Sequence, residues 1–514
     1  MTTYIDSLVA ALGDAGSRPV VRRAGTDTTG TDLLAMINRY GRVLGELGLG
    51  RGDLVALLAP NRPEALAVRY AAHLIGAAAV YLSAPTSAET RARMIAQFDP
   101  RLVVVFPETV GLLPAGVTAP VAAVGPVPGV TLRLDARAAG QPAGPVEVRA
   151  RPEDLAVVIS SGGTTGVPKG SRRDFAAYTV CVTPPRPAPD RRQLANGKLA
   201  YLTQILADQT LLGGGTVVLQ DHFEPVATLD AIERERITHL FLVEPQLFML
   251  MDHPAVPAHD LSSLRMLTHI GALAAPVLRR RARERLGPVI AHTYGASEIG
   301  IVSLLTPAEH DRPARFRCAG RIQPGVDVRF RRPDGSLDPR AGAIEARSAG
   351  MALGYRHRPA EEAGHFTDGW YRTGDLGALD GEDMLQIFGR AADIGDGTVT
   401  PVQLQETLCQ QPGVRYAVLV AEPGQGTWIA AAEAWPGGSV DVGQCQAAIA
   451  ALHGEQAAAS VHVMPIGRIP LTRAGQARPA RDPGHRARPG RWCRLAGSPS
   501  WRARSRSGLS PRSR

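Results

Sequence analysis

Short apolar runs that alternate with helical stretches are the feature that most restricts how this chain can fold. Residues 54–59 and 155–159 are apolar throughout, which is typical of strands buried on both faces of a sheet. Residues 33–47 and 64–77, by contrast, carry the spacing of helices. Strands that alternate with helices predict a parallel sheet covered by helices on both faces, that is, an α/β fold.

The pattern changes twice toward the C-terminus. Between about residues 315 and 388 it shortens into strands and glycine-rich turns, and residues 390–475 read as a smaller α/β unit. From residue 476 the periodicity disappears and little is left to bury. We therefore predict three parts. A large N-terminal domain (1–389) has parallel-rich sheets packed with helices and a β-rich subdomain, a small C-terminal α/β domain spans 390–475, and a disordered basic tail spans 476–514.

The net charge of +9 could suggest a partner with negative charge such as nucleic acid. The tail alone, however, holds eleven arginines and one acid, so residues 1–475 are close to neutral. We therefore reject a nucleic-acid-binding function for the folded part of the chain. No membrane partner is expected either, because no run of eighteen apolar residues occurs.

The numbers and positions of the lysines and cysteines bear on which residues are functional and on where the protein works. The only two lysines are Lys169 and Lys198, so each is a better functional candidate than an average lysine. The five cysteines are scattered without paired spacing, which argues against a metal site or a disulfide framework. Together with a start that lacks the pattern of a signal peptide, this predicts a protein of the cytoplasm.

The segment 160–170 reads Ser-Ser-Gly-Gly-Thr-Thr-Gly-Val-Pro-Lys-Gly and directly follows the apolar run 155–159. Glycines let a backbone approach an anion, hydroxyls donate to phosphate oxygens, and a lysine supplies a positive charge for a polyphosphate. A Walker-type loop is excluded because Pro168, not glycine, precedes the lysine. The residues predicted to contact phosphate are Ser161, Gly162, Gly163, Thr164, Thr165, Gly166 and Lys169.

Four further segments accompany this loop in order. They are Gly48–Asn61, the run His-Thr-Tyr-Gly-Ala-Ser-Glu at 292–298, the run Gly-Trp-Tyr-Arg-Thr-Gly-Asp-Leu at 369–376, and Phe-Gly-Arg-Ala-Ala-Asp at 388–393. With the loop, they make residues 25–475 resemble the adenylate-forming family of acyl-CoA synthetases, luciferases and peptide-synthetase adenylation domains. The resemblance implies that the small domain is mobile and swings about the junction near Asp393.

The same resemblance implies a role for each matching residue. Lys169, Glu298 and Arg390 are implied to be catalytic, and Glu298 to bind Mg²⁺. Asp375 is implied to accept hydrogen bonds from the ribose hydroxyls, Arg390 to reach the ribose or phosphates, and Tyr294 to stack on adenine. The remaining residues implied to line the nucleotide or acyl site are Gly271, Ala272, Gly295 and Ser297. For His292 the sequence leaves open a packed histidine and a pocket residue, and for Trp370 it favours packing.

The sequence departs from the family at the end of the small domain. Residues 470–476 read Pro-Leu-Thr-Arg-Ala-Gly-Gln, where the family has lysine in place of Gln476. Inserting one nucleotide into codons for Gly-Lys-Pro-Asp-Arg gives the Gly-Gln-Ala-Arg-Pro found at 475–479. We hypothesise a frameshift before the tail, which resequencing of the locus would test. If Gln476 is native, adenylation should be slow, because an amide cannot replace a cation.

Two further departures bear on the acceptor and the acid. The link 394–400 is about two residues shorter than in the family, which makes the use of CoA less secure than adenylation. A free α-amino acid is disfavoured, because no aspartate stands where amino-acid-activating members bind the amine. We expected Glu244, Gln246 and His269 to place polar groups near the acyl pocket.

The leading prediction is an AMP-forming acid–thiol ligase. It uses ATP and Mg²⁺ to convert a carboxylic acid into an acyl-adenylate with release of pyrophosphate, and then transfers the acyl group to CoA. The alternatives are transfer to a carrier protein or an amine, N–N bond formation with nitrite, and a non-catalytic nucleotide-binding relative.

Overall fold

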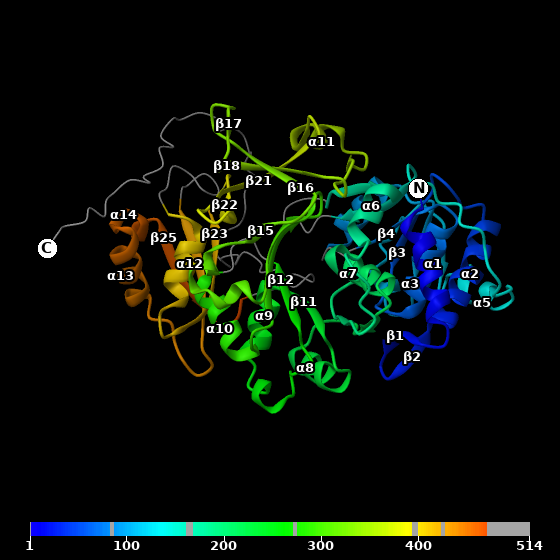
Figure 1. Ribbon diagram of the computed structural model, residues 1–514, viewed down its shortest axis with the longest axis horizontal. Helices are drawn as coiled ribbons and strands as arrows, with labels where there is room; N and C mark the ends of the chain where they lie inside the picture. The colour runs from blue at the N-terminus through cyan, green and yellow to red at the C-terminus, as the bar shows by residue number, and fades with distance from the viewer. Residues whose placement is uncertain are drawn as a thin grey trace.

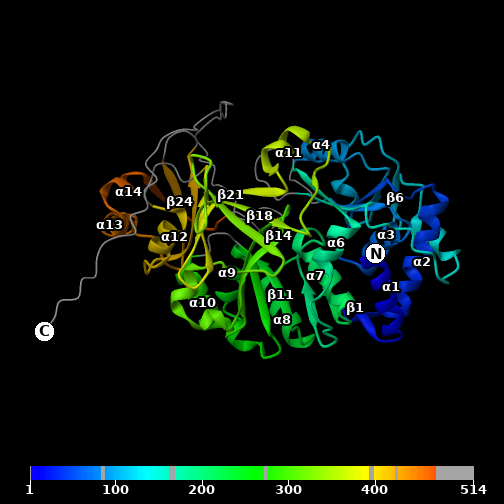
Figure 2. The ribbon, with the colours of Figure 1, turned by 45° about the horizontal axis from the view of Figure 1, so that its top comes forward.

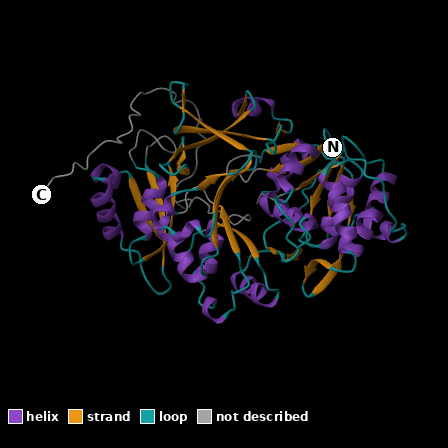
Figure 3. Cartoon of the chain, viewed as in Figure 1, coloured by secondary structure: helices purple, strands orange, loops and turns teal. Residues whose placement is uncertain are grey.

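The computed structural model describes residues 2–82, 87–160, 168–270, 275–392, 399–422 and 427–469. Within these ranges the strands form three sheets that follow one another from the N-terminal to the C-terminal end of the molecule (Figure 1). Helices and strands are mixed throughout (Figure 3). The predicted α/β fold is therefore confirmed.

The first sheet has seven strands and forms the N-terminal end of the molecule. Its order is β19 (Gly354–Tyr355), β8 (Gly170–Asp174), β7 (Leu155–Ser160), β4 (Ala78–Tyr81), β3 (Leu54–Leu58), β5 (Leu102–Val105) and β6 (Val121–Ala123). The strands from β7 to β6 are parallel, whereas β8 and β19 are added antiparallel. The helices of this region are α1 (Tyr4–Ala15), α2 (Gly30–Glu46), α3 (Pro63–Leu74), α4 (Ala88–Phe98), α5 (Leu134–Ala139) and α6 (Phe175–Val182).

The second sheet runs through the middle of the molecule and changes character along its length. Its parallel part consists of β1 (Pro19–Arg23), β10 (Thr216–Leu219), β9 (Arg192–Ala195), β11 (His239–Val243), β12 (Met266–Ile270) and β13 (Ile290–Ala296). The helices beside this part are α7 (Tyr201–Leu212), α8 (Pro225–Arg234), α9 (Glu244–Met251) and α10 (Pro276–Leu286). At one edge, β2 (Thr26–Thr29) pairs antiparallel with β1.

Beyond β13 the second sheet becomes antiparallel, which corresponds to the predicted β-rich subdomain. Its strands are β14 (Gly300–Leu305), β15 (Gly320–Ile322), β16 (Val326–Arg331), β17 (Leu337–Asp338), β18 (Ala341–Ser348), β20 (Phe366–Thr367), β21 (Trp370–Leu379) and β22 (Met384–Arg390). Helix α11 (Pro359–His365) lies between β19 and β20 and sits beside α4 (Figure 2). The four short 3₁₀ helices are Val110–Leu112, Val256–Ala258, Glu309–Asp311 and Pro313–Arg317.

The third sheet belongs to the predicted small domain and lies at the end of the molecule opposite α1 and α2 (Figure 1). Its strands are β23 (Val414–Ala421), β24 (Trp428–Ala434) and β25 (Val461–Ile466), and its helices are α12 (Pro401–Cys409), α13 (Val442–His453) and α14 (Glu455–Ala459). Leu404 and Tyr416 share a hydrophobic core with Phe248 and Leu278 of α9 and α10. The division at residues 389 and 390 stays a prediction.

No helix within the described ranges is long and apolar enough to span a membrane.

Candidate active site

The turn between β13 and β14 carries two of the predicted residues, Tyr294 and Glu298. Gly295 makes this turn possible, because a Cβ atom there would lie 2.1 Å from the carbonyl oxygen of Gly300. The turn is fixed from outside: Ser171 Oγ donates to the carbonyl of Ser297 at 3.2 Å, and Ala352 N donates to that of Glu298 at 2.7 Å. Glu298 is consequently held in place at 7% exposure.

Asp375 connects this turn to the antiparallel part of the sheet. It lies on β21 directly opposite Arg390 on β22, and Arg390 Nε lies 3.2 Å from Asp375 Oδ1. Tyr294 Oη donates a hydrogen bond to Asp375 Oδ2 at 2.7 Å. Burial, and then the Asp375 carboxylate, raise the pKa of Tyr294 well above its usual value, so the phenol stays protonated and remains a donor.

Arg390 is oriented by its own neighbours on β21. One of its terminal nitrogens, Nη1, donates to the carbonyl of Thr373 at 2.6 Å, while Thr373 Oγ1 accepts from the backbone N–H of Asp375 at 3.0 Å. The side chain of Arg390 nevertheless remains 58% exposed. A guanidinium that is held through two of its nitrogens while its side chain stays open to solvent can reach an anionic ligand.

Lys169 immediately precedes β8 and meets Glu298 through Tyr355. Its Nζ lies 5.1 Å above the ring of Tyr355, whose hydroxyl donates to Glu298 Oε1 at 2.8 Å. The same Nζ lies 3.2 Å from Nε2 of His365. Burial, followed by Glu298, raises the pKa of Tyr355 above its usual value, so this phenol too is a neutral donor.

These two groups of residues belong to one site. Tyr294 and Glu298 are four residues apart on the same turn, and Tyr371 on β21 lies close enough to both carboxylates to respond to them. Burial, then the Glu298 carboxylate and after it the Asp375 carboxylate, raise the pKa of Tyr371. The structure therefore brings together Lys169, Tyr294, Glu298, Asp375 and Arg390, with Gly295 and Ser297 in the supporting turn.

Several predicted residues lie outside the described residues: 161–166 of the loop, Gly271, Ala272, Asp393, most of the short link, Gln476 and the tail. Other residues of the site were missed by sequence reasoning. Thr373 lies inside the matched segment 369–376, whereas nothing in the local sequence distinguishes Tyr355 or His365.

The three polar residues expected near the acyl pocket have other contacts. Glu244 Oε1 accepts hydrogen bonds from Gln405 Nε2 and Tyr416 Oη, both at 3.1 Å, and Gln246 Oε1 accepts from Val243 N at 3.2 Å. His269 is fully buried against His292, with the ring centroids 4.6 Å apart. Of the two interpretations of His292, the structure supports the packed histidine.

Trp370 has the predicted packing role, since the guanidinium groups of Arg329 and Arg347 lie 4.2 and 4.6 Å from its ring centroid.

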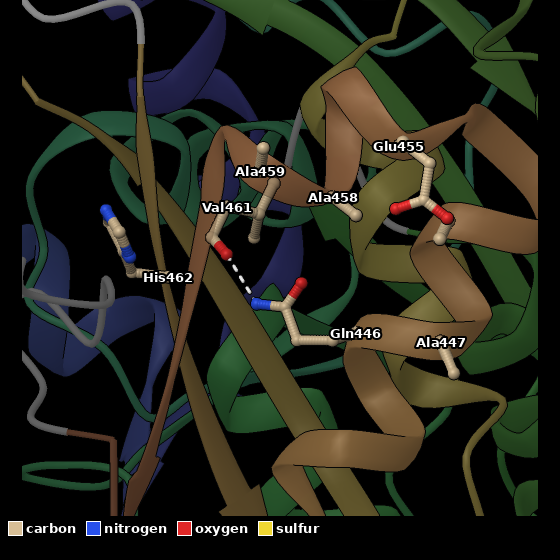
Figure 4. A pocket seen from close by; sticks show the side chains of 8 residues that line it. Gln446, Ala447, Glu455, Ala458, Ala459, Val461 and His462 are labelled. Atoms are coloured by element: carbon tan, nitrogen blue, oxygen red, sulfur yellow. Dashed lines mark hydrogen bonds between the residues drawn. The ribbon is translucent and has the colours of Figure 1, made fainter.

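A surface hollow on the small domain lies apart from the site. It is lined by residues of α13, α14 and β25, and Gln446 Nε2 donates to the carbonyl of Val461 there at 2.7 Å (Figure 4). None of the predicted nucleotide-site residues lines it.

The sequence profile of the family described as AMP-binding enzyme matches residues 10–356, well over half of the chain. The chain belongs to the AMP-binding enzyme family. The resemblance to adenylate-forming enzymes is therefore confirmed.

Relatives within the AMP-binding enzymes agree with the predicted class, an AMP-forming acid–thiol ligase. The chain is 30% identical to the feruloyl-CoA synthase of an Amycolatopsis species over 78% of this chain and 82% of the relative. It is 29% identical to the medium/long-chain-fatty-acid–CoA ligase FadD8 of Mycobacterium tuberculosis, over 81% of this chain and 76% of the relative. Among solved structures, the amide bond synthetase McbA of Marinactinospora thermotolerans is 32% identical, with a TM-score of 0.81 over 92% of this chain and 98% of McbA.

Proposed function

We propose that the protein uses ATP to activate a carboxylic acid as an acyl-adenylate and then transfers the acyl group to CoA. The observation that carries the proposal is the convergence of Lys169, Glu298, Tyr294, Asp375 and Arg390, which come from distant parts of the sequence, into adjoining hydrogen-bonded groups. A reaction between two anions needs such an arrangement, because the protein must hold both and stabilise the charge that develops.

The chemistry proceeds in two displacements. A carboxylate oxygen of the acid forms a bond to the α-phosphorus of ATP, and the bond from that phosphorus to the bridging oxygen of the β-phosphate breaks, so pyrophosphate leaves. The sulfur of CoA then forms a bond to the acyl carbon, its proton is lost, and AMP leaves. Lys169 and the loop before it hold the β- and γ-phosphates, Asp375 accepts hydrogen bonds from the ribose, and Tyr294 stacks on adenine.

Glu298 suits a magnesium ion that is shared with the nucleotide. Mg²⁺ prefers oxygen ligands and is commonly bound by one or two carboxylates together with substrate phosphates. Glu298 is a single, nearly buried carboxylate that Tyr355 fixes through one oxygen. When bound, Mg²⁺ would neutralise charge on the phosphates.

An amine is the second candidate acceptor. The identity to the amide bond synthetase McbA, 32%, is as high as the identity to the CoA ligases, and it extends over 98% of McbA. In that case the nitrogen of an amine, in place of the CoA sulfur, would form the bond to the acyl carbon.

Acid-dependent exchange of labelled pyrophosphate into ATP tests the first displacement. The assay is run with a panel of aryl and alkyl acids on the protein as it stands and on Gln476→Lys, which supplies the cation that the family has there. Exchange with at least one acid is expected, and faster exchange for Gln476→Lys. Absence of exchange from both proteins would support a non-catalytic nucleotide-binding relative.

Product mass then identifies the acceptor. CoA, a panel of amines, a carrier protein and nitrite are supplied in turn with an acid that gave exchange. A thioester of CoA is expected. An amide with no thioester would favour the second candidate, and a carrier-bound or N–N-bonded product would favour the remaining alternatives.

A further inference from the structure

His365 is the neighbour of Lys169 that no sequence pattern indicated. It ends helix α11, 196 residues further along the chain, and its Nε2 lies 3.2 Å from Lys169 Nζ. Its other ring nitrogen, Nδ1, lies 3.4 Å from the carbonyl oxygen of Arg372. A carbonyl can only accept, so Nδ1 carries the proton and Nε2 offers its lone pair to the lysine ammonium.

The neutral ring that this arrangement requires is favoured by the surroundings. Burial, followed by the Lys169 ammonium, lowers the pKa of His365. The ring also has little freedom to turn, because it stacks on Tyr371 at an interplanar angle of 27° and meets the ring of Tyr355 edge-on at 85°. Tyr355 is fixed in turn by its hydrogen bond to Glu298.

The helix that carries His365 is fastened next to Lys169. Glu362 on α11 accepts from the backbone N–H of Tyr355 at 2.9 Å and pairs with Arg172 of β8 at 3.1 Å. Gly354 leaves room for this carboxylate: its φ is +136°, and a Cβ atom there would lie 2.2 Å from Glu362. Beside α11, Arg356 Nε donates to the carbonyl of Phe98 at the end of α4.

We propose that His365 is a positioning residue that orients the Lys169 ammonium toward the polyphosphate of the nucleotide. This inference rests on the proposed function, which assigns Lys169 to the β- and γ-phosphates. A lysine side chain has four rotatable bonds, and a ligand that must immobilise all of them binds more weakly. An ammonium has three N–H donors, and a hydrogen bond to His365 occupies one of them.

The test compares ATP with AMP, which lacks the two phosphates in question. His365→Phe keeps an aromatic ring on Tyr371 but removes the acceptor, whereas His365→Gln offers an amide oxygen at similar reach. Dissociation constants for both nucleotides are measured by titration calorimetry on the full chain, and thermal unfolding verifies that each variant is folded.

We expect His365→Phe to weaken ATP binding about three- to tenfold, the range of the net contribution of one hydrogen bond, and to leave AMP binding unchanged. His365→Gln should restore most of the ATP affinity. In a Lys169→Met background, His365→Phe should have no further effect, because the lysine through which it acts is gone.

The proposal would be overturned if His365→Phe weakened the binding of ATP and AMP equally, or left the affinity for ATP unchanged. It would also be overturned if His365→Gln bound ATP as weakly as His365→Phe. If the protein binds ATP but shows pyrophosphate exchange with none of the acids tested, the proposed function is contradicted. The effect of His365 on ATP affinity can still be measured in that case. Failure of the unaltered protein to bind ATP at all would reject both.

Discussion

Aspartate, arginine and tyrosine form two similar groups in this protein, with opposite surroundings. In the N-terminal half, Asp208 on α7 pairs with Arg69 on α3, and these side chains are 0% and 1% exposed. Near the turn at β13, Asp375 pairs with Arg390, whose side chain is 58% exposed. The residue types are the same, so the surroundings must determine which group is structural and which can bind a ligand.

The hydrogen bonds make the contrast concrete. Tyr70 Oη donates to Asp208 Oδ1 at 2.6 Å, Tyr178 Oη donates to Oδ2 at 2.7 Å, and Arg69 donates to both oxygens. This carboxylate is saturated by protein groups inside a core, where an unpaired charge would be very costly. At Asp375 the cation faces solvent, and a nucleotide can replace water there without exposing a core.

Removing the buried acid should give the largest effect. Asp208→Ala leaves Arg69 charged inside the core, and we expect a loss of about 3–5 kcal/mol in the free energy of unfolding. Urea denaturation monitored by circular dichroism measures this loss. Asp208→Asn, which keeps the volume but not the charge, should also be strongly destabilised. A loss below about 1 kcal/mol for either variant would contradict a structural role for this pair.

Removing the corresponding acid at the candidate site should reverse the pattern. Asp375→Ala should lower kcat/KM for ATP in pyrophosphate exchange about 100-fold, or about 3 kcal/mol, because two hydrogen bonds to the ribose are lost. Its free energy of unfolding should fall by less than that of Asp208→Ala, because Arg390 remains hydrated and only the buried hydroxyl of Tyr294 loses its acceptor.

Asp327→Ala is the matched control for Asp375→Ala. Asp327 also pairs with an arginine of the same sheet, Arg347 at 2.8 Å, but both side chains are more than half exposed. Neither activity nor stability should change measurably. Strong destabilisation by Asp375→Ala would mean that this pair, too, is structural.

Tyr178 and Tyr294, which donate to Asp208 and Asp375, allow the two groups to be compared by removing a single hydroxyl from each. Burial, followed by the adjacent aspartate, raises the pKa of both Tyr178 and Tyr294, so each is a neutral donor to a carboxylate. Tyr178→Phe should lower the free energy of unfolding by about 1.5–3 kcal/mol without changing KM for ATP. Tyr294→Phe should cost less in unfolding than Tyr178→Phe, because Asp375 keeps its pairing with the hydrated Arg390, and it should raise KM for ATP a few-fold. Equal changes in stability and in KM for the two variants would contradict the distinction between a structural group and a ligand-binding group.

The elements were predictable where local pattern determines them. The apolar runs 54–59 and 155–159 correspond to β3 and β7, because a strand without polar residues can only be buried. The candidate site was predictable where its residues lie in matched segments, as Tyr294, Glu298 and Asp375 do.

Contacts between distant residues were not predictable in this way. His365 meets Lys169 only because Glu362 fastens α11 to β8 and β19, and neither partner has a local pattern that indicates the other. Asp208 is a second example. It lies on α7, whereas its partner Arg69 lies on α3, 139 residues away in the sequence. The contacts of Glu244 are a third example, since Gln405 and Tyr416 reach it from the predicted small domain.

Glu244 offers the smallest predicted effect. It is an intermediate case between the two aspartates, because it is partly buried and accepts hydrogen bonds from neutral groups. Burial raises its pKa, an effect that the hydrogen bonds from Gln405 and Tyr416 only partly offset. A carboxyl group whose pKa is higher in the folded than in the unfolded protein stabilises the fold when protonated. This contribution is complete below the unfolded pKa, about 4.3, and is lost as the pH rises through the folded value.

Glu244→Gln is neutral at every pH, so the variant should gain stability relative to the unaltered protein as the pH rises. We expect the gain to be at most about 1 kcal/mol near pH 7 and to vanish below pH ~4. Urea denaturation across this pH range measures it. Glu422→Gln is the control, because Glu422 accepts from Thr427 Oγ1 at 2.5 Å at the far end of β23, away from Glu244. The difference between Glu422→Gln and the unaltered protein should not follow the Glu244 profile. A Glu244→Gln effect independent of pH would contradict a raised pKa of Glu244 in the folded protein.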